Sequence, residues 1–133
     1  MIPRGNQLTL GEFMLLLKLQ DPNESVKYDF VYFGPTTLES YRGYYEDVAL
    51  GYEECGRSIH SNRSYEYPTV QALLAHCEET IGKVFSGWKG GNGTPVSFSS
   101  TLWVANPGES GSTAIVGVEK LLYVTIITKE IEG

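Results

Sequence analysis

The chain has 133 residues, of which 41% are hydrophobic and 20% are charged, and its formal net charge is −6. The length predicts a single domain over residues 1–133, and the hydrophobic content excludes a disordered chain. The negative charge argues against non-specific binding of DNA or RNA, which requires a basic surface. Nine tyrosines, each with an apolar ring and a polar hydroxyl, suit either a binding surface or a sheet.

The first predicted element is a helix that begins after Thr9. Thr9 and Glu12 have the spacing of a capping box, in which each side chain bonds to the backbone amide of the other residue. Leu15 and Leu16 widen the apolar face, so we expect this helix to be well buried and to end near residues 21–23. The apolar face itself recurs at intervals of three and four residues: Leu10, Phe13, Met14 and Leu17.

Two β-strands are predicted after this helix. Residues 26–33 are rich in β-branched and aromatic side chains, and Gly34 and Pro35 predict the end of this strand. Residues 44–52 form the second predicted strand. The polar residues 53–68 predict a surface loop, which is long for a connection within one domain and long enough to cover a binding site.

A second helix is predicted to begin at Pro68 and Thr69 and to end at Gly82, a typical C-terminal cap. Its buried stripe has helical spacing: Val70, Leu73, Leu74, Cys77 and Ile81.

Three further strands are predicted near residues 101–105, 112–118 and 121–128. The last one alternates poorly between apolar and polar residues, which predicts burial on both faces or against a partner chain. The order of elements, with short connections near the end, predicts an α+β fold in which two helices pack on a mainly antiparallel sheet.

The sequence contains no motif of a metal site or of a known catalytic triad. Cys55 and Cys77 do not have metal-ligand spacing, so we expect no metal or cofactor and two free thiols in a reducing cytoplasm, with one disulfide between them as the alternative. The longest apolar run, residues 13–19, is too short to span a bilayer, and we expect no membrane association. We expect no catalysis either, with an enzyme that uses His60 or His76 to cleave a cyclic nucleotide as an alternative.

A basic, aromatic and glycine-rich segment spans residues 82–91, and a second basic and aromatic segment spans residues 40–45. Glycine lets backbone amides approach an anion, lysine and arginine bind phosphate, and tyrosine and tryptophan stack on rings. The alternative is a flexible turn with Trp88 packed in the core and a surface arginine stacked on tyrosine. We predict a site for a phosphorylated, ring-containing ligand at these residues: Tyr41, Arg42, Tyr44, Trp88, Lys89, Gly90 and Gly91.

The segments SYRGYY (residues 40–45) and GWKGG (residues 87–91) resemble a group of small proteins that are encoded mostly by bacteriophages. The resemblance covers residues 8–118 and implies a phage accessory protein in the cytoplasm of an infected bacterial cell. Small phage proteins that bind nucleotides include sponges that sequester immune signals, of the anti-Thoeris and anti-CBASS kind. By this analogy we expect a homo-oligomer that holds, uncleaved, a nucleotide-derived second messenger such as a cyclic nucleotide or a cyclic ADP-ribose-like molecule. The alternative is an inhibitor that binds a bacterial host or defence protein.

Overall fold

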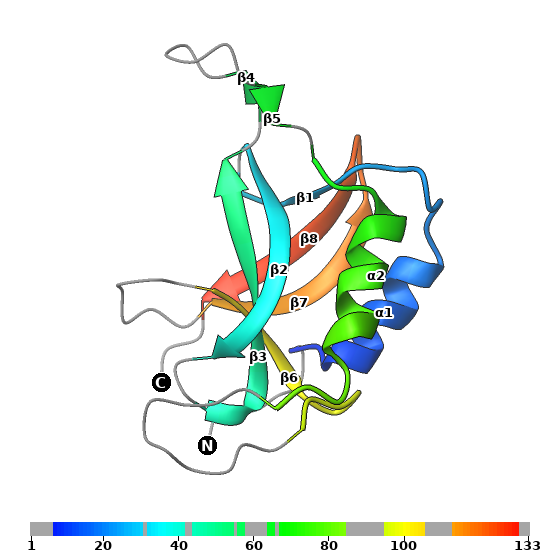
Figure 1. Cartoon of the computed structure of the whole chain (residues 1–133). Coiled ribbons are helices and arrows are strands. Elements are labelled where there is room, and N and C mark those ends of the chain that lie inside the picture. Colours follow the sequence, from blue (N-terminus) through cyan, green and yellow to red (C-terminus); the bar gives the residue numbers. More distant parts are fainter. Residues whose placement is uncertain are drawn as a thin grey trace.

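Two helices pack side by side on one side of a curved six-stranded sheet (Figure 1). The computed structural model describes residues 7–30, 32–41, 44–54, 56–57, 64–65, 67–84, 95–105 and 113–130. The predicted α+β fold with a mainly antiparallel sheet is confirmed. The helices and the strands of the main sheet are α1 (Leu10–Lys18), α2 (Val70–Thr80), β1 (Val26–Tyr28), β2 (Phe33–Tyr41), β3 (Tyr44–Glu54), β6 (Thr101–Val104), β7 (Thr113–Lys120) and β8 (Val124–Glu130).

Helix α1 begins with the predicted capping box. The Thr9 hydroxyl accepts a hydrogen bond from the Glu12 amide at 3.2 Å, and the Glu12 carboxylate accepts one from the Thr9 amide at 2.9 Å. The predicted apolar stripe is buried. The prediction that Leu15 extends this buried face is wrong, since Leu15 is 63% exposed. Leu15 lies on the face opposite the stripe, and only the stripe packs on the core.

Helix α2 also follows its prediction. The Thr69 hydroxyl caps it by accepting a hydrogen bond from the Ala72 amide at 3.1 Å, and Val70, Leu73 and Cys77 are fully buried. Gly82, just after the helix, has a φ of 87°, a conformation that glycine adopts without steric cost. Among the described residues, no helix is long and apolar enough to cross a membrane.

The sheet has the strand order β1-β8-β7-β6-β3-β2. Neighbouring strands are antiparallel at β8–β7, β7–β6 and β3–β2, and parallel at β1–β8 and β6–β3. The strands β1 and β2, which are consecutive in the chain, therefore form the two opposite edges of the sheet. These edges also contact each other, because the sheet curves until it nearly closes into a barrel (Figure 1).

The single strand predicted over residues 26–33 is wrong. The chain leaves the sheet after Tyr28 and enters it again at Phe33 on the opposite edge, so these residues belong to two strands. The predicted stop at Gly34 and Pro35 is also wrong, since β2 continues through both. Proline is tolerated there because β2 is an edge strand, where an amide donor is not required on the outer side.

The other strand predictions hold with shifted boundaries. Strand β3 extends to Glu54, and the predicted loop over residues 53–68 contains a separate two-stranded sheet of β4 (Gly56–Arg57) and β5 (Ser64–Tyr65). Residues 121–123 form the turn between β7 and β8 and do not belong to the last strand. The expected two-sided burial of that strand applies to Val124–Ile126 and is lost towards its end.

Tyr28 joins two strands that are not neighbours in the sheet. Its side chain is fully buried, and its hydroxyl donates to the carbonyl oxygens of Leu50 and Gly51 on β3, at 3.0 and 2.9 Å. Burial, with a smaller contribution from Tyr52, raises the pKa of Tyr28 well above its usual value. The hydroxyl therefore stays protonated and links the β1 edge to the opposite side of the curved sheet.

We expect Tyr28→Phe to lower the free energy of unfolding by about 0.5–1.5 kcal/mol, because the hydrogen bond from the buried hydroxyl is lost while the Leu50 carbonyl keeps its bond from the Ala105 amide at 2.8 Å. Urea denaturation of the variant and the wild type measures this difference. Tyr32→Phe is the matched control: Tyr32 is 63% exposed, and removal of an exposed hydroxyl should change stability by less than about 0.5 kcal/mol. Equal effects of the two substitutions would contradict the structural role of Tyr28.

The buried thiol of Cys77 predicts a loss of stability at alkaline pH. Burial, with a smaller contribution from Glu78, raises the pKa of Cys77 from 9.0 to about 12. The unfolded chain releases this proton near its ordinary pKa, so the stabilising contribution is complete below about pH 9 and is lost as the pH rises towards about 12.

Melting temperatures measured at half-unit steps from pH 8 to pH 10.5 test this expectation. Over the affected range, each pH unit should cost up to about 1.4 kcal/mol of unfolding free energy. Cys77→Ala should show a shallower decline with pH than the wild type. Identical slopes for the two proteins would show that Cys77 does not contribute.

Candidate functional site

The structure describes two of the residues that the sequence predicts as ligand contacts. Tyr41 and Tyr44 are paired in register at the end of the β2–β3 hairpin. The remaining five lie outside the described part of the chain: Arg42, Trp88, Lys89, Gly90 and Gly91. The grouping of all seven residues into one site therefore stays a prediction.

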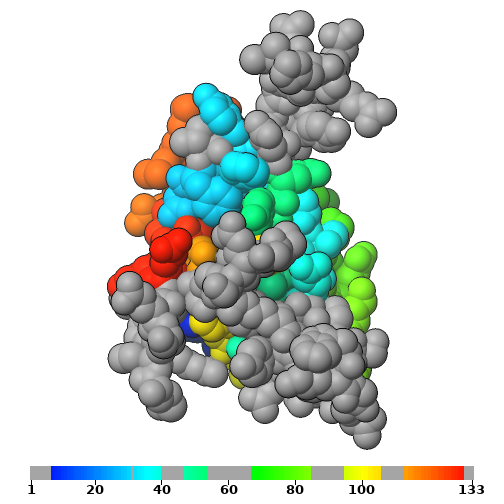
Figure 2. Space-filling view, turned by 90° about the vertical axis from the view of Figure 1, so that its left-hand side faces the viewer, coloured from blue at the N-terminus to red at the C-terminus, as the bar shows by residue number. Residues whose placement is uncertain are grey.

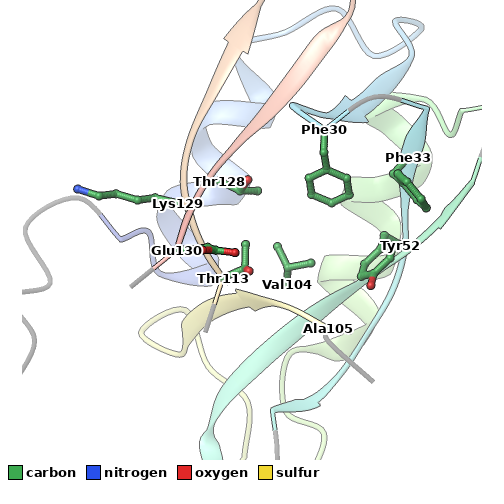
Figure 3. Close-up of a pocket in the computed structure, with 9 residues that line it drawn as sticks. All are labelled: Phe30, Phe33, Tyr52, Val104, Ala105, Thr113, Thr128, Lys129 and Glu130. Atoms are coloured by element: carbon green, nitrogen blue, oxygen red, sulfur yellow. The ribbon is translucent and has the colours of Figure 1, made fainter. Parts of the chain in front are cut away.

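A pocket of about 450 Å³ opens on the inner, concave side of the sheet (Figure 3). This volume is within the range of about 300–1,000 Å³ that is typical of small-molecule sites. Figure 3 shows two walls that face each other, one aromatic and one polar, with Val104 and Ala105 between them. Among the described residues, those that line the pocket come from strands and from the β1–β2 connection, and none comes from a helix.

The pocket continues the hydrophobic core beyond the part that the helices cover. Side chains two residues apart on a strand point to the same face. Tyr52, Val104 and Thr128 each lie two residues beyond a fully buried core residue of the same strand segment: Leu50, Leu102 and Ile126. The inner face of the sheet is therefore longer than the two helices can fill, and its uncovered end forms the pocket.

The aromatic wall consists of Phe30, Phe33 and Tyr52. The ring centres of Phe30 and Phe33 lie 5.4 Å apart, and the Tyr52 ring stands nearly perpendicular to both, at 83° and 85°. Phe30 also stacks on the buried Tyr28 ring at 4.7 Å with an interplanar angle of 12°. The three rings are half-buried, so they are held in place by each other and by Tyr28 while part of their surface faces the pocket.

The polar wall consists of Thr113, Thr128 and Glu130. Asp29, from the β1–β2 connection, accepts hydrogen bonds from the amide of Thr128 at 2.9 Å and from its hydroxyl at 2.7 Å. Figure 2 shows this junction from outside, with the red end of β8 beside the light-blue residues that follow β1. The junction fixes Thr128 and ties the polar wall to the segment that carries the aromatic wall.

The charge of the polar wall is negative. The carboxylate of Glu130 points into the pocket, whereas the side chain of Lys129 extends away from it (Figure 3). Asp29 adds a second carboxylate behind Thr128. This wall suits hydrogen-bond donors or a positive group, and it disfavours a phosphate in direct contact.

The described part of the chain brings no known catalytic arrangement to this pocket. His76 and Cys77 lie on α2 and are not among the lining residues, and the pKa of Cys77, raised to about 12 by burial, keeps its thiol protonated. Within the described ranges, no group of three or more histidine, cysteine, aspartate and glutamate residues is placed to hold a metal ion.

The pocket and the predicted tyrosine segment are different places on the chain. Phe33 is at the start of β2 and Tyr41 is at its end. The strand has 9 residues, so at about 3.3 Å per residue about 26 Å of extended chain separates them. The backbone of Tyr41 therefore lies at the opposite end of β2 from the pocket.

The sequence analysis missed the residues of the pocket. The sequence predicts one continuous strand through Phe30 and Phe33, and the signal against it is the charged Asp29 within residues 28–33, which are otherwise apolar or aromatic. Tyr52 joins them because β2 pairs with β3 and places Pro35 opposite Tyr52. Glu130 had no distinguishing signal, since it is one of several charged residues near the end of the sequence.

Comparison with protein-family models, with curated proteins and with solved structures finds no match to this chain. The resemblance of residues 40–45 and 87–91 to phage-encoded proteins therefore stays a prediction. The function is inferred from the chemistry of the pocket and of these two segments.

We expect Asp29→Ala to speed hydrogen exchange at the Thr128 amide, because that amide loses its acceptor and becomes accessible to solvent. Amide exchange followed by NMR at residue resolution measures the effect. Asp21→Ala is the control. Asp21 also accepts a backbone hydrogen bond, from the Asn23 amide at 2.9 Å, but this bond is local and does not involve Thr128. An unchanged Thr128 rate in Asp29→Ala would mean that the junction does not hold the polar wall.

Proposed function

We propose that this protein binds a nucleotide-derived small molecule, takes its base into the aromatic pocket and holds it without cleaving it. The observation that carries the proposal is the wall of three half-exposed rings, fixed against each other in a pocket of about 450 Å³. Stacking of a base on an aromatic side chain contributes about 1–3 kcal/mol and requires no catalytic group. A pocket of this kind suits capture of a ligand.

The physiological role that we propose is sequestration of an immune second messenger in the cytoplasm of a phage-infected bacterium. The support for this role is the resemblance of the SYRGYY and GWKGG segments to phage-encoded proteins. A sponge needs tight binding and no turnover, which fits a pocket whose described lining residues include no histidine, cysteine or serine. The messenger would be a cyclic nucleotide or a cyclic ADP-ribose-like molecule.

The phosphate groups of such a ligand would lie away from the polar wall. Glu130 and Asp29 repel an anion, so the base would enter first and the phosphates would remain at the mouth of the pocket. Arg42 and Lys89 are the predicted phosphate contacts. Because Tyr41 is about 26 Å from the pocket end of β2, Arg42 would bind a phosphate at a separate site or from a second copy in a homo-oligomer.

A thermal-shift screen against linear and cyclic mono-, di- and trinucleotides and ADP-ribose derivatives tests the proposal. A ligand at about 1,000 times its Kd adds about 4 kcal/mol to stability, which raises the melting temperature by several degrees. Phe30→Leu should remove most of that ligand-induced shift, because it removes a ring from the stacking wall. Phe98→Leu makes the same chemical change at a side chain that is 60% exposed outside the pocket, and it should keep the shift.

The result that would overturn the proposal is the absence of a shift with every compound of the panel. A shift of equal size in Phe30→Leu and Phe98→Leu would place the ligand outside the aromatic pocket. Recovery of intact ligand after denaturation of the complex separates a sponge from an enzyme, since a cyclic-nucleotide-cleaving enzyme would release a linear product.

A second candidate function is inhibition of a bacterial host or defence protein by direct binding. The turn between β7 and β8 exposes Leu121 by 59% and Leu122 by 86%, and the Tyr123 ring beside them lies 5.4 Å from that of Tyr67. Adjacent exposed apolar side chains of this kind are typical of a protein-binding surface. Loss of a co-purifying bacterial protein in Leu122→Ser, with the nucleotide-induced shift intact, would favour this function.

A further inference from the structure

The polar wall of the pocket offers a specific set of hydrogen-bonding groups. The Glu130 carboxylate presents two acceptor oxygens and no donor. The Thr128 hydroxyl uses its hydrogen in the bond to Asp29, whereas the Thr113 hydroxyl has no hydrogen-bond partner among the described residues. The wall therefore places a pair of acceptors beside one hydroxyl that is free to donate.

The positions of the rings and of the polar wall allow a base that stacks on one ring to present its edge to this wall. Tyr52 stands nearly perpendicular to Phe30 and Phe33, so a base that stacks on the face of one ring lies edge-on to another. Glu130 and Thr113 lie across the pocket from these rings (Figure 3). Stacking and recognition of the base edge are therefore compatible within the same pocket, which is how proteins read an unpaired base.

The four bases differ in the groups on their Watson–Crick edge. Guanine has two adjacent donors there, at N1 and at the 2-amino group, followed by the O6 acceptor. Adenine and cytosine each place one amino donor beside a ring-nitrogen acceptor, and uracil has a single donor between two acceptors. A carboxylate can accept two parallel hydrogen bonds from guanine alone, and such charge-assisted pairs are about twice as strong as neutral ones.

We propose that the pocket selects guanine, so that the ligand is a guanine nucleotide. The Glu130 carboxylate accepts from N1 and the 2-amino group, the Thr113 hydroxyl donates to O6, and the base stacks on the aromatic wall. This inference rests on the proposed function, since it names which base occupies the pocket. It also accounts for an acidic wall in a nucleotide site, because the carboxylate contacts the base and not the phosphate.

The test compares the Kd values of guanosine, inosine and adenosine 5′-monophosphates, measured by isothermal titration calorimetry. The three probes carry the same sugar and phosphate, so differences between them report the base alone. Guanosine monophosphate should bind at least about tenfold more tightly than adenosine monophosphate. Inosine monophosphate, which lacks the 2-amino group, should bind with intermediate affinity.

Glu130→Gln provides the sharper test. A glutamine side chain has one acceptor and one donor, which match the amino group and N1 of adenine. The variant should therefore reverse the preference, with adenosine monophosphate bound more tightly than guanosine monophosphate. Glu119→Gln makes the same charge change on β7, six positions from Thr113 and outside the pocket lining, and it should keep the guanine preference.

The possible outcomes separate this inference from the proposed function. Equal binding of the three monophosphates, or a guanine preference that Glu130→Gln leaves unchanged, overturns the selection of guanine by Glu130 and leaves nucleotide binding in place. Binding of none of them, together with no response in the wider nucleotide screen, overturns both. Circular dichroism of Glu130→Gln checks that the variant is folded before its preference is compared.

Discussion

The buried hydroxyl of Tyr28 joins the two sides of the curved sheet across its interior. Strand β1 is paired only with β8, in a short parallel ladder of three residues. Tyr28 crosses the interior from this edge and donates to Leu50 and Gly51 on β3, four places away in the strand order. Without these acceptors the Tyr28 hydroxyl would be unsatisfied in an apolar interior, which costs about 1–3 kcal/mol.

The pocket forms where the curved sheet brings its two edge strands together. The connection between Tyr28 and Phe33 passes from one edge of the sheet to the other and carries Phe30 into the opening. Phe30 stacks on Tyr28, and Asp29 bonds to Thr128, so one short connection positions both the aromatic and the polar wall. Tyr32, within this connection, has a φ of 68°, a costly conformation for a residue other than glycine. The same connection therefore contributes to the packing of the interior and forms part of the pocket.

The local chemistry of the pocket differs from that of the two basic segments. An acidic wall opposite aromatic rings favours a donor-rich ring, whereas Arg42 and Lys89 favour a phosphate. Both preferences fit one class of ligand, a nucleotide. Its base can donate hydrogen bonds to an acidic wall, whereas its phosphates accept them from basic residues. Strand β2 separates the pocket, at Phe33, from Tyr41 by about 26 Å of extended chain.

The sequence alone determined the features that depend on neighbouring residues. Both helices, their threonine caps, their buried stripes and Gly82 after α2 follow from patterns within a single turn or a few turns, and all are present. The α+β class follows from the same local patterns in order along the chain. Such features are encoded locally, because helix periodicity and capping bonds join residues three or four positions apart.

Only the tertiary structure decided which strands are neighbours and, with them, the site. The run of residues 26–33 is rich in strand-forming side chains, yet the curved sheet divides it between opposite edges. Glu130 faces Phe30 across the pocket although 100 positions separate them in the sequence, and no local pattern marks either residue. Contacts of this range depend on the curvature and register of the whole sheet, which arise from the packing of all its strands and not from any one segment.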